Sequence, residues 1–207
     1  AHPYQEIYPP LATPDYGPFL SQLDPSQTDA VYAWVAGADA VRLVKQYAEF
    51  GLKDRLPLYG YATLTDDVIL PAIGDAALGL LTIGAYTSQL QTPANVKFVR
   101  EYEAAHGILP SRYSATGYIG AQLIGKAVQL LRGDLKNRGA VVRALKEAAG
   151  QIESPRGPVQ LDKYGQVIPT LYMTRTERKG QRLVNVVVDE IPNVTQESTW
   201  DWWMKAK

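Results

Sequence analysis

Short apolar runs alternate with amphipathic segments through the first 86 residues. Runs that are apolar nearly throughout are typical of strands buried on both faces of a parallel sheet. The runs that predict strands are 29–36, 56–61 and 77–86. We also expect 5–11 to be extended and 16–27 to be helical. This alternation predicts an α/β domain whose parallel sheet is covered by helices.

The segment 38–52 is the clearest predicted helix of this first part. Its apolar side chains fall on one face at helical spacing, and its charged side chains fall on the opposite face. The apolar face comprises Val41, Val44, Tyr47 and Ala48. Gly51 suits the C-terminal end of such a helix. An amphipathic helix that follows a buried strand fits one layer of an α/β sheet.

From Pro93 the pattern changes to three successive helices, 93–107, 112–133 and 135–150. The second is apolar nearly all round, so it needs a large covering surface, and no strand in this stretch supplies one. Its glycines, serine, threonine and glutamines make it too polar for a convincing membrane span, which favours a buried helix. These helices therefore predict a surface that other residues cover.

After Gly150 the sequence turns β-like, with predicted strands in 157–162, 164–175 and 182–191. The turn 176–181 joins the last two. The basic side chains around it are Arg175, Arg178, Lys179 and Arg182. We interpret them as a solvated hairpin tip rather than a nucleic-acid patch. Three tail tryptophans are expected to anchor the terminus by packing, and they are Trp200, Trp202 and Trp203.

Composition narrows the possible partners. Twenty-one basic and 21 acidic residues give zero formal charge, so no global field favours nucleic acid. Cysteine is absent, which rules out disulfides and thiolate metal sites within these residues. The first ten residues lack the features of a signal peptide, so any export signal is expected to lie outside this sequence. We expect no cofactor, no metal and no nucleic-acid partner.

Catalytic motifs are missing. The sequence holds no G-x-S-x-G, H-E-x-x-H, P-loop or G-x-G-x-x-G pattern. His106 precedes Gly107 at a predicted helix end, where it complements the terminal carbonyls. Asp66 and Asp67 are adjacent, and neighbours on a helix point about 100° apart, so they are poor candidates for a carboxylate pair. The sequence does not predict an enzyme.

Several segments, taken in order, resemble one family. They are the stretches 14–23, 29–53, 56–60, 70–82, 93–111 and 154–162, which include "PDYGPFLSQL", "DAVYAWVAGADAVRLVKQYAEFGLK" and "SPRGPVQLD". In combination they are similar to the periplasmic solute-binding proteins of branched-chain amino-acid-type ABC importers. Such proteins have two Rossmann-like lobes joined by three crossovers, and they close on a small ligand in the cleft between the lobes.

The resemblance implies a domain organisation. Residues 1–84 would form part of lobe two without its first β-α unit, 85–153 would be a helical segment of lobe one, and 154–207 would return to lobe two with a hairpin and tail. Crossovers are expected at 82–87 and 154–158. The helices 93–149 would pack on an N-terminal half that this sequence lacks, or on a second chain. Without that partner their apolar faces would be exposed, and we name Val96, Val99, Tyr118, Leu123 and Leu130.

Ligands of open α/β sheets bind beyond the carboxyl ends of the strands. Gly37 there permits close backbone approach by a ligand or simply a tight turn, and both interpretations stand. For Asp39 a place in the first helical turn is favoured over ligand binding. The candidate ligand-binding residues are Ala36, Gly37, Asp39, Tyr61, Ala62, Thr63 and Tyr113. The three that carry rings or hydroxyls suit core packing as well as a pocket wall.

One departure from the family concerns the ligand. Where amino-acid binders place an acidic residue for the ligand's ammonium, this sequence has Ala62, and near Ala36 a family tyrosine is also absent. Without a carboxylate a cationic amine would be poorly compensated. This favours an aromatic or aliphatic carboxylate, with an amino acid left open if Asp39 or Asp66 rotates inward.

The resemblance implies a periplasmic or extracellular binding protein that delivers a small molecule to an ABC permease by hinge closure. A sensor or receptor module of the same fold is the alternative. A hydrolase is a third class, which no residue constellation supports.

Overall fold

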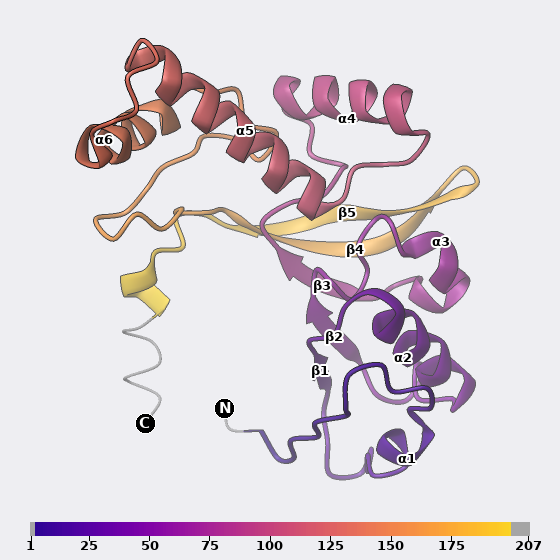
Figure 1. Cartoon of the computed structure of the whole chain (residues 1–207). Helices are drawn as coiled ribbons and strands as arrows, with labels where there is room; N and C mark the ends of the chain where they lie inside the picture. The colour runs from indigo at the N-terminus through magenta and orange to yellow at the C-terminus, as the bar shows by residue number, and fades with distance from the viewer. Residues whose placement is uncertain (1–2, 200–207) are drawn as a thin grey trace. The chain divides into compact units, whose positions relative to one another are not determined.

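The computed structural model describes residues 3–199 and contains two compact units. Unit 1 comprises Ala1–Gly84 and Met173–Asp189, and unit 2 comprises Ala85–Tyr172 and Glu190–Lys207. The expected packing of Trp200, Trp202 and Trp203 lies outside the described residues. Strands and helices alternate as predicted (Figure 1), so the α/β class is confirmed.

Unit 1 is built on a five-stranded sheet with the strand order β1-β2-β3-β4-β5. Its strands are β1 (Val31–Ala33), β2 (Leu58–Tyr61), β3 (Leu81–Gly84), β4 (Leu171–Lys179) and β5 (Arg182–Ile191). The first three are parallel, and Tyr32 of β1 lies opposite Tyr59 of β2. They are shorter than the apolar runs that predicted them. Parallel pairing brings their carboxyl ends to one edge of the sheet.

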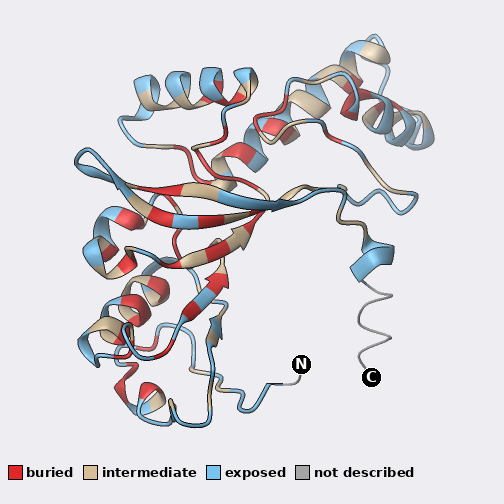
Figure 2. Cartoon of the chain, turned by 180° about the vertical axis from the view of Figure 1, so that it is seen from behind, coloured by how far each residue is buried: buried red, intermediate tan, exposed pale blue. Residues whose placement is uncertain are grey.

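Helices of unit 1 bury their apolar faces on this sheet (Figure 2). They are α1 (Gly17–Leu20), α2 (Gly37–Glu49), α3 (Leu70–Ile73) and the 3₁₀ turn η1 (Gly74–Ala77). In α2, Val44 and Tyr47 are each 1% exposed, which confirms the predicted buried face. The Tyr47 hydroxyl donates a hydrogen bond of 2.8 Å to the Leu56 carbonyl oxygen, and burial raises the pKa of this tyrosine to about 12. The buried face therefore packs α2 on the sheet, and the Tyr47 hydrogen bond ties the last turn of the helix to the segment before β2.

Residues 5–11, which were expected to be extended, join no strand ladder, and Pro9 and Pro10 lack the N–H groups that a ladder requires. One local prediction in unit 1 was wrong. The predicted helix 16–27 is reduced to α1, after which the Ser21 hydroxyl bonds back to the Gly17 carbonyl oxygen. Asp24 precedes a proline, which disfavours the helical conformation at that residue.

Unit 2 contains the three predicted long helices, α4 (Pro93–His106), α5 (Arg112–Leu130) and α6 (Arg138–Ala149). Each begins at a side-chain cap, from Thr92, Ser111 and Asn137 respectively. α5 and α6 pack through small side chains, namely Ala127, Ala144 and Ala148. Within residues 3–199 no helix combines the length and apolarity that crossing a membrane requires.

Exposure within unit 2 only partly follows the prediction. Val96 is 51% and Tyr118 37% exposed, and Val99 is half-buried. Leu123 and Leu130 were expected to be exposed, but they pack against clusters that α5 forms with α6 and its neighbours. A surface hollow of about 460 Å³ lies between residues 88–91 and α4. Its lining includes Val96 and Val99.

The chain passes between the two units three times, after Gly84, Tyr172 and Asp189. The first passage falls in the expected crossover 82–87. The segment 154–158 lies inside unit 2 instead, and the expected hairpin turn narrows to Gly180 and Gln181. Arg178 of the basic hairpin tip pairs with Asp75. Assignment of the units to lobes stays a prediction.

Candidate functional site

Six of the seven predicted site residues lie in unit 1, where β1 and β2 end. Ala36 and Gly37 follow β1, while Tyr61 ends β2 and Ala62 follows it. The Thr63 hydroxyl donates a hydrogen bond of 2.7 Å to the Val35 carbonyl oxygen and so joins the two strand ends. We call this group of strand ends the carboxyl edge. The structure brings the sequence-predicted residues of unit 1 together there.

Ala36 and Gly37 form the turn from β1 into α2. Gly37 adopts φ of +58°, in the left-handed region where side chains are strained, so the turn itself requires glycine. A Cβ at this position would meet no atom within 4 Å, which leaves open space beside the backbone. Ala36 is extended and offers no side-chain cap to α2. The first amide groups of α2 therefore face the carboxyl edge without a capping side chain.

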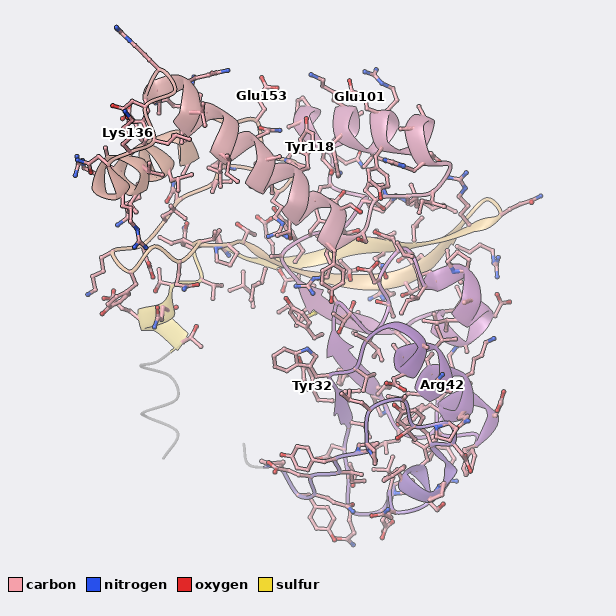
Figure 3. The ribbon with its side chains drawn as sticks, viewed as in Figure 1. Tyr32, Arg42, Glu101, Tyr118, Lys136 and Glu153 are labelled. Atoms are coloured by element: carbon pink, nitrogen blue, oxygen red, sulfur yellow. The ribbon has the colours of Figure 1, made fainter. Side chains whose placement is uncertain are left out.

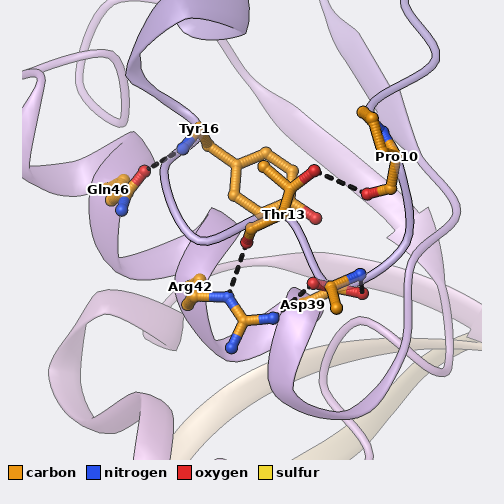
Figure 4. A network of polar contacts seen from close by, with 7 residues as sticks. Pro10, Thr13, Tyr16, Asp39, Arg42 and Gln46 are labelled. Atoms are coloured by element: carbon orange, nitrogen blue, oxygen red, sulfur yellow. Dashed lines mark hydrogen bonds and ion pairs between the residues drawn. The ribbon is translucent and has the colours of Figure 1, made fainter.

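Asp39 is bound by its own neighbours (Figure 4). Its carboxylate accepts a hydrogen bond of 3.0 Å from the Ala12 amide and pairs with Arg42 at 2.5 Å. Arg42 also donates to the Thr13 carbonyl oxygen at 2.8 Å. The Ala12 amide, together with Arg42, lowers the pKa of Asp39 below 3.8. This geometry supports the structural role that the sequence favoured, with Asp39 tying 10–13 to α2.

Ala62 fits tightly between strand ends. Its amide donates a hydrogen bond of 2.9 Å to the Ile83 carbonyl oxygen. A Cβ placed on Gly84 would approach the Ala62 Cβ to 2.4 Å, which is a clash. A larger side chain at residue 84 is therefore excluded while Ala62 holds its present place.

The neighbouring acidic side chains are also engaged. Asp66 accepts the Val68 amide at 3.2 Å, in a local turn. Asp67 is 8% exposed and accepts a hydrogen bond of 3.3 Å from the Asn185 side chain. Asp39, Asp66 and Asp67 thus each accept a hydrogen bond from another group of unit 1. A ligand without an ammonium group would need none of these carboxylates as a partner.

Trp34 is a residue at this edge that the sequence interpretation missed. It is 74% exposed, and its ring centroid lies 5.5 Å from that of Tyr61 at an interplanar angle of 50°. Tyr32, two residues earlier, points from the strand on the side away from Arg42 of α2 (Figure 3). The alternation of Tyr32 and Trp34 with apolar Val31, Ala33 and Val35 was the available signal, because period two marks a strand with two different faces.

Tyr113, the seventh predicted residue, belongs to unit 2 and opens α5. It is 59% exposed, and the Arg112 guanidinium lies 4.9 Å from its ring centroid. Ser111 caps the helix and accepts the Tyr113 amide at 3.1 Å. Arg156 donates to the Arg112 carbonyl oxygen at 3.3 Å, which ties 154–158 to this helix start. The ring is thus held at a fixed helix terminus.

Metal ligands do not gather in the part of the chain that the structure describes. Within residues 3–199 no three His, Cys, Asp or Glu side chains lie close enough to hold an ion. The carboxyl edge offers backbone amides, aromatic rings and hydroxyl groups.

A family model described as "Periplasmic binding protein" matches residues 3–181. A Leu/Ile/Val-binding protein homolog of Brucella melitensis is 34% identical over 163 residues, which are 76% of this chain and 41% of that protein. The chain therefore spans less than half the length of this curated relative.

Solved structures agree with the fold. An ABC transporter substrate-binding protein from Sphaerobacter thermophilus has 37% identity and a TM-score of 0.83, covering 89% of this chain and 51% of its own. A solute-binding protein from R. palustris in complex with benzoate has 30% identity and a TM-score of 0.79, and the match covers 90% of this chain and 50% of that one. The chain therefore belongs to the periplasmic binding protein family.

Proposed function

We propose that this protein is the solute-binding component of an ABC importer and that its ligand is a small carboxylate without an α-amino group. The observation that carries the ligand class is the state of the acidic residues at the carboxyl edge. Ala62 stands where the resemblance to amino-acid binders leads us to expect an acid, and the nearby carboxylates are each engaged by protein groups. An ammonium group brought here would lose its hydration without gaining a free carboxylate.

The carboxyl edge suits an uncharged or aromatic part of such a ligand. The rings of Trp34 and Tyr61 and the small Ala36 and Ala62 leave apolar surface beside the amide groups of α2. Those amides and the partial positive charge of a helix start favour polar or anionic ligand groups. The benzoate complex of a relative at 30% identity supports an acid, whereas the Leu/Ile/Val name of another relative supports the amino-acid alternative.

Transport by such a protein requires closure and release rather than chemistry. Members of this family are periplasmic binding proteins, so we propose no catalytic activity for this chain. We also propose a periplasmic or extracellular location and an ABC permease as the partner. The remaining half of the cleft would come from the part of the relatives' length that this chain does not span. The same part, or a second chain, would cover the helices 93–149, where Val96 and Tyr118 are exposed.

A thermal-shift panel on the full-length gene product tests this proposal. The panel contains benzoate, 4-hydroxybenzoate, leucine, isoleucine and valine. We expect the benzoates to raise the melting temperature by about 4 °C or more at saturation, because a ligand at 100 times its Kd contributes about 2.7 kcal/mol. A shift from leucine, isoleucine or valine alone, with no response to either benzoate, would contradict the proposed ligand class.

A further inference from the structure

Two aromatic rings stand together at the carboxyl edge of unit 1, and they come from adjacent strands. The register of β1 and β2 pairs Tyr32 with Tyr59 and Ala33 with Gly60, so Trp34 comes level with Tyr61. Their ring centroids lie 5.5 Å apart at 50°. We call Trp34 and Tyr61 the aromatic pair.

The pair differs from ordinary core aromatics in its exposure. Trp34 is 74% exposed, whereas Tyr47, on the opposite side of the same strands, is 1% exposed. Tilted rings at this distance attract each other, yet their contact leaves most of the indole without a partner in unit 1. An indole with that much free surface at a strand end is available to a further planar group.

Its surroundings restrict what that group is. Ala36, two residues after Trp34, puts only a methyl group on the same face of the strand. This face therefore combines two large rings with a small Ala36, which suits a flat ligand better than a branched one.

We infer that the aromatic pair selects the ring of an aromatic acid, with Trp34 as the principal specificity-determining residue. This inference rests on the proposed function and adds the residue that distinguishes an aromatic from an aliphatic acid. The ring of the ligand packs on the indole at an offset or tilted angle, as aromatic pairs prefer. A protein helix that covers this sheet face is the competing occupant, and it predicts a different result.

Titration calorimetry on the full-length gene product separates these outcomes. The ligands are leucine, benzoate and cyclohexanecarboxylate, of which the last two have the same carboxylate and ring size but differ in aromatic character. The variants are Trp34→Ala and Trp34→Phe, and Tyr59→Ala is the control. Tyr59 is also an exposed ring, and it lies two residues before Tyr61 on β2, further from the carboxyl edge.

We expect Trp34→Ala to weaken benzoate binding about tenfold, since an aromatic contact and its buried area amount to roughly that factor. Trp34→Phe keeps an aromatic face and should stay within about threefold of the wild type. Tyr59→Ala should change the affinity less than twofold, and the preference of the wild type for benzoate over cyclohexanecarboxylate should vanish in Trp34→Ala.

Two results overturn the inference in distinguishable ways. If wild-type protein binds benzoate and Trp34→Ala binds it equally well, only the role of the aromatic pair is wrong. A lower melting temperature of that ligand-free variant would then assign Trp34 to the covering helix. If the wild type binds leucine and neither acid, the proposed ligand class and the inference fail together.

Discussion

Asp39 at the carboxyl edge is held by other groups of the protein. Its two carboxylate oxygens are taken by the Ala12 amide and by Arg42, so the side chain links the segment before α1 to the first turn of α2. A ligand ammonium would have to compete with a guanidinium and a backbone donor that are already in place. This is the residue-level reason for favouring an acid without an amino group.

The lowered pKa of Asp39 gives a prediction about pH. A carboxylate whose pKa is lower in the folded than in the unfolded state stabilises the fold above 3.8, and that contribution is lost as the pH falls through the folded value. We expect Asp39→Asn to reduce the free energy of unfolding by about 0.5–1.5 kcal/mol at pH 7. The difference from the wild type should shrink below pH 3.8.

Urea unfolding of the full-length gene product between pH 2.5 and 7 measures this effect. Asp54 is exposed, and Asp54→Asn is the matched control, which should reproduce the wild-type profile. An equal difference between the wild type and Asp39→Asn at every pH would show that the charge of Asp39 contributes nothing.

Single residues were predictable from sequence where chemistry dictated them. Gly37 was identified because a bare turn must separate a strand from a helix, and its positive φ confirms the tight turn. Trp34 was missed because the run 29–36 was interpreted as apolar on both faces. Its period-two alternation contained the information, but which face lies open depends on neighbours distant in sequence.

A polar network between elements holds the β4–β5 hairpin in unit 1. Asn185 of β5 is 6% exposed, and its side-chain amide donates to the Thr65 carbonyl oxygen at 2.6 Å. Its side-chain oxygen accepts from the Thr176 hydroxyl at 3.0 Å. Hydroxyls of Thr65, Thr82 and Thr174 continue the network in 3.0 Å steps. The loop after β2 is therefore positioned by a hairpin about 120 residues away in sequence.

Removal of the Asn185 amide should loosen this arrangement. Asn185→Ala leaves the Thr65 carbonyl and the Thr176 hydroxyl buried without their partner, so we expect a loss of about 2–3 kcal/mol in the free energy of unfolding. Denaturant unfolding of the full-length gene product measures it. Gln181→Ala, at the exposed hairpin turn, should change stability by less than about 0.5 kcal/mol. Equal effects of the two substitutions would refute the network's role.

Elements were predictable where their ends carry chemical signals. Thr92, Ser111 and Asn137 each cap a helix, so α4, α5 and α6 begin within three residues of their predicted starts. The strands β1 to β3 were correct in place but too long in prediction. Apolar composition continues past the last ladder hydrogen bond, and composition alone does not show where pairing stops.

At the scale of the whole molecule, the proposed covering of helices 93–149 by other residues agrees with exposed apolar side chains. In unit 2, Val96, Tyr113, Ile124 and Val142 are each more than half exposed. The chain also spans only about half of the solved structures that it matches. The sequence predicted that these helices need a partner, but not which leucines α6 would cover, because that depends on how α5 and α6 pack.

We propose that the ligand has a carboxylate and no ammonium group. Titration calorimetry of the full-length gene product with leucine and 4-methylpentanoate tests this proposal, since the two ligands differ only in the amino group. We expect at least tenfold tighter binding of 4-methylpentanoate, because the carboxylates of Asp39, Asp66 and Asp67 are already engaged. Tighter binding of leucine would contradict it.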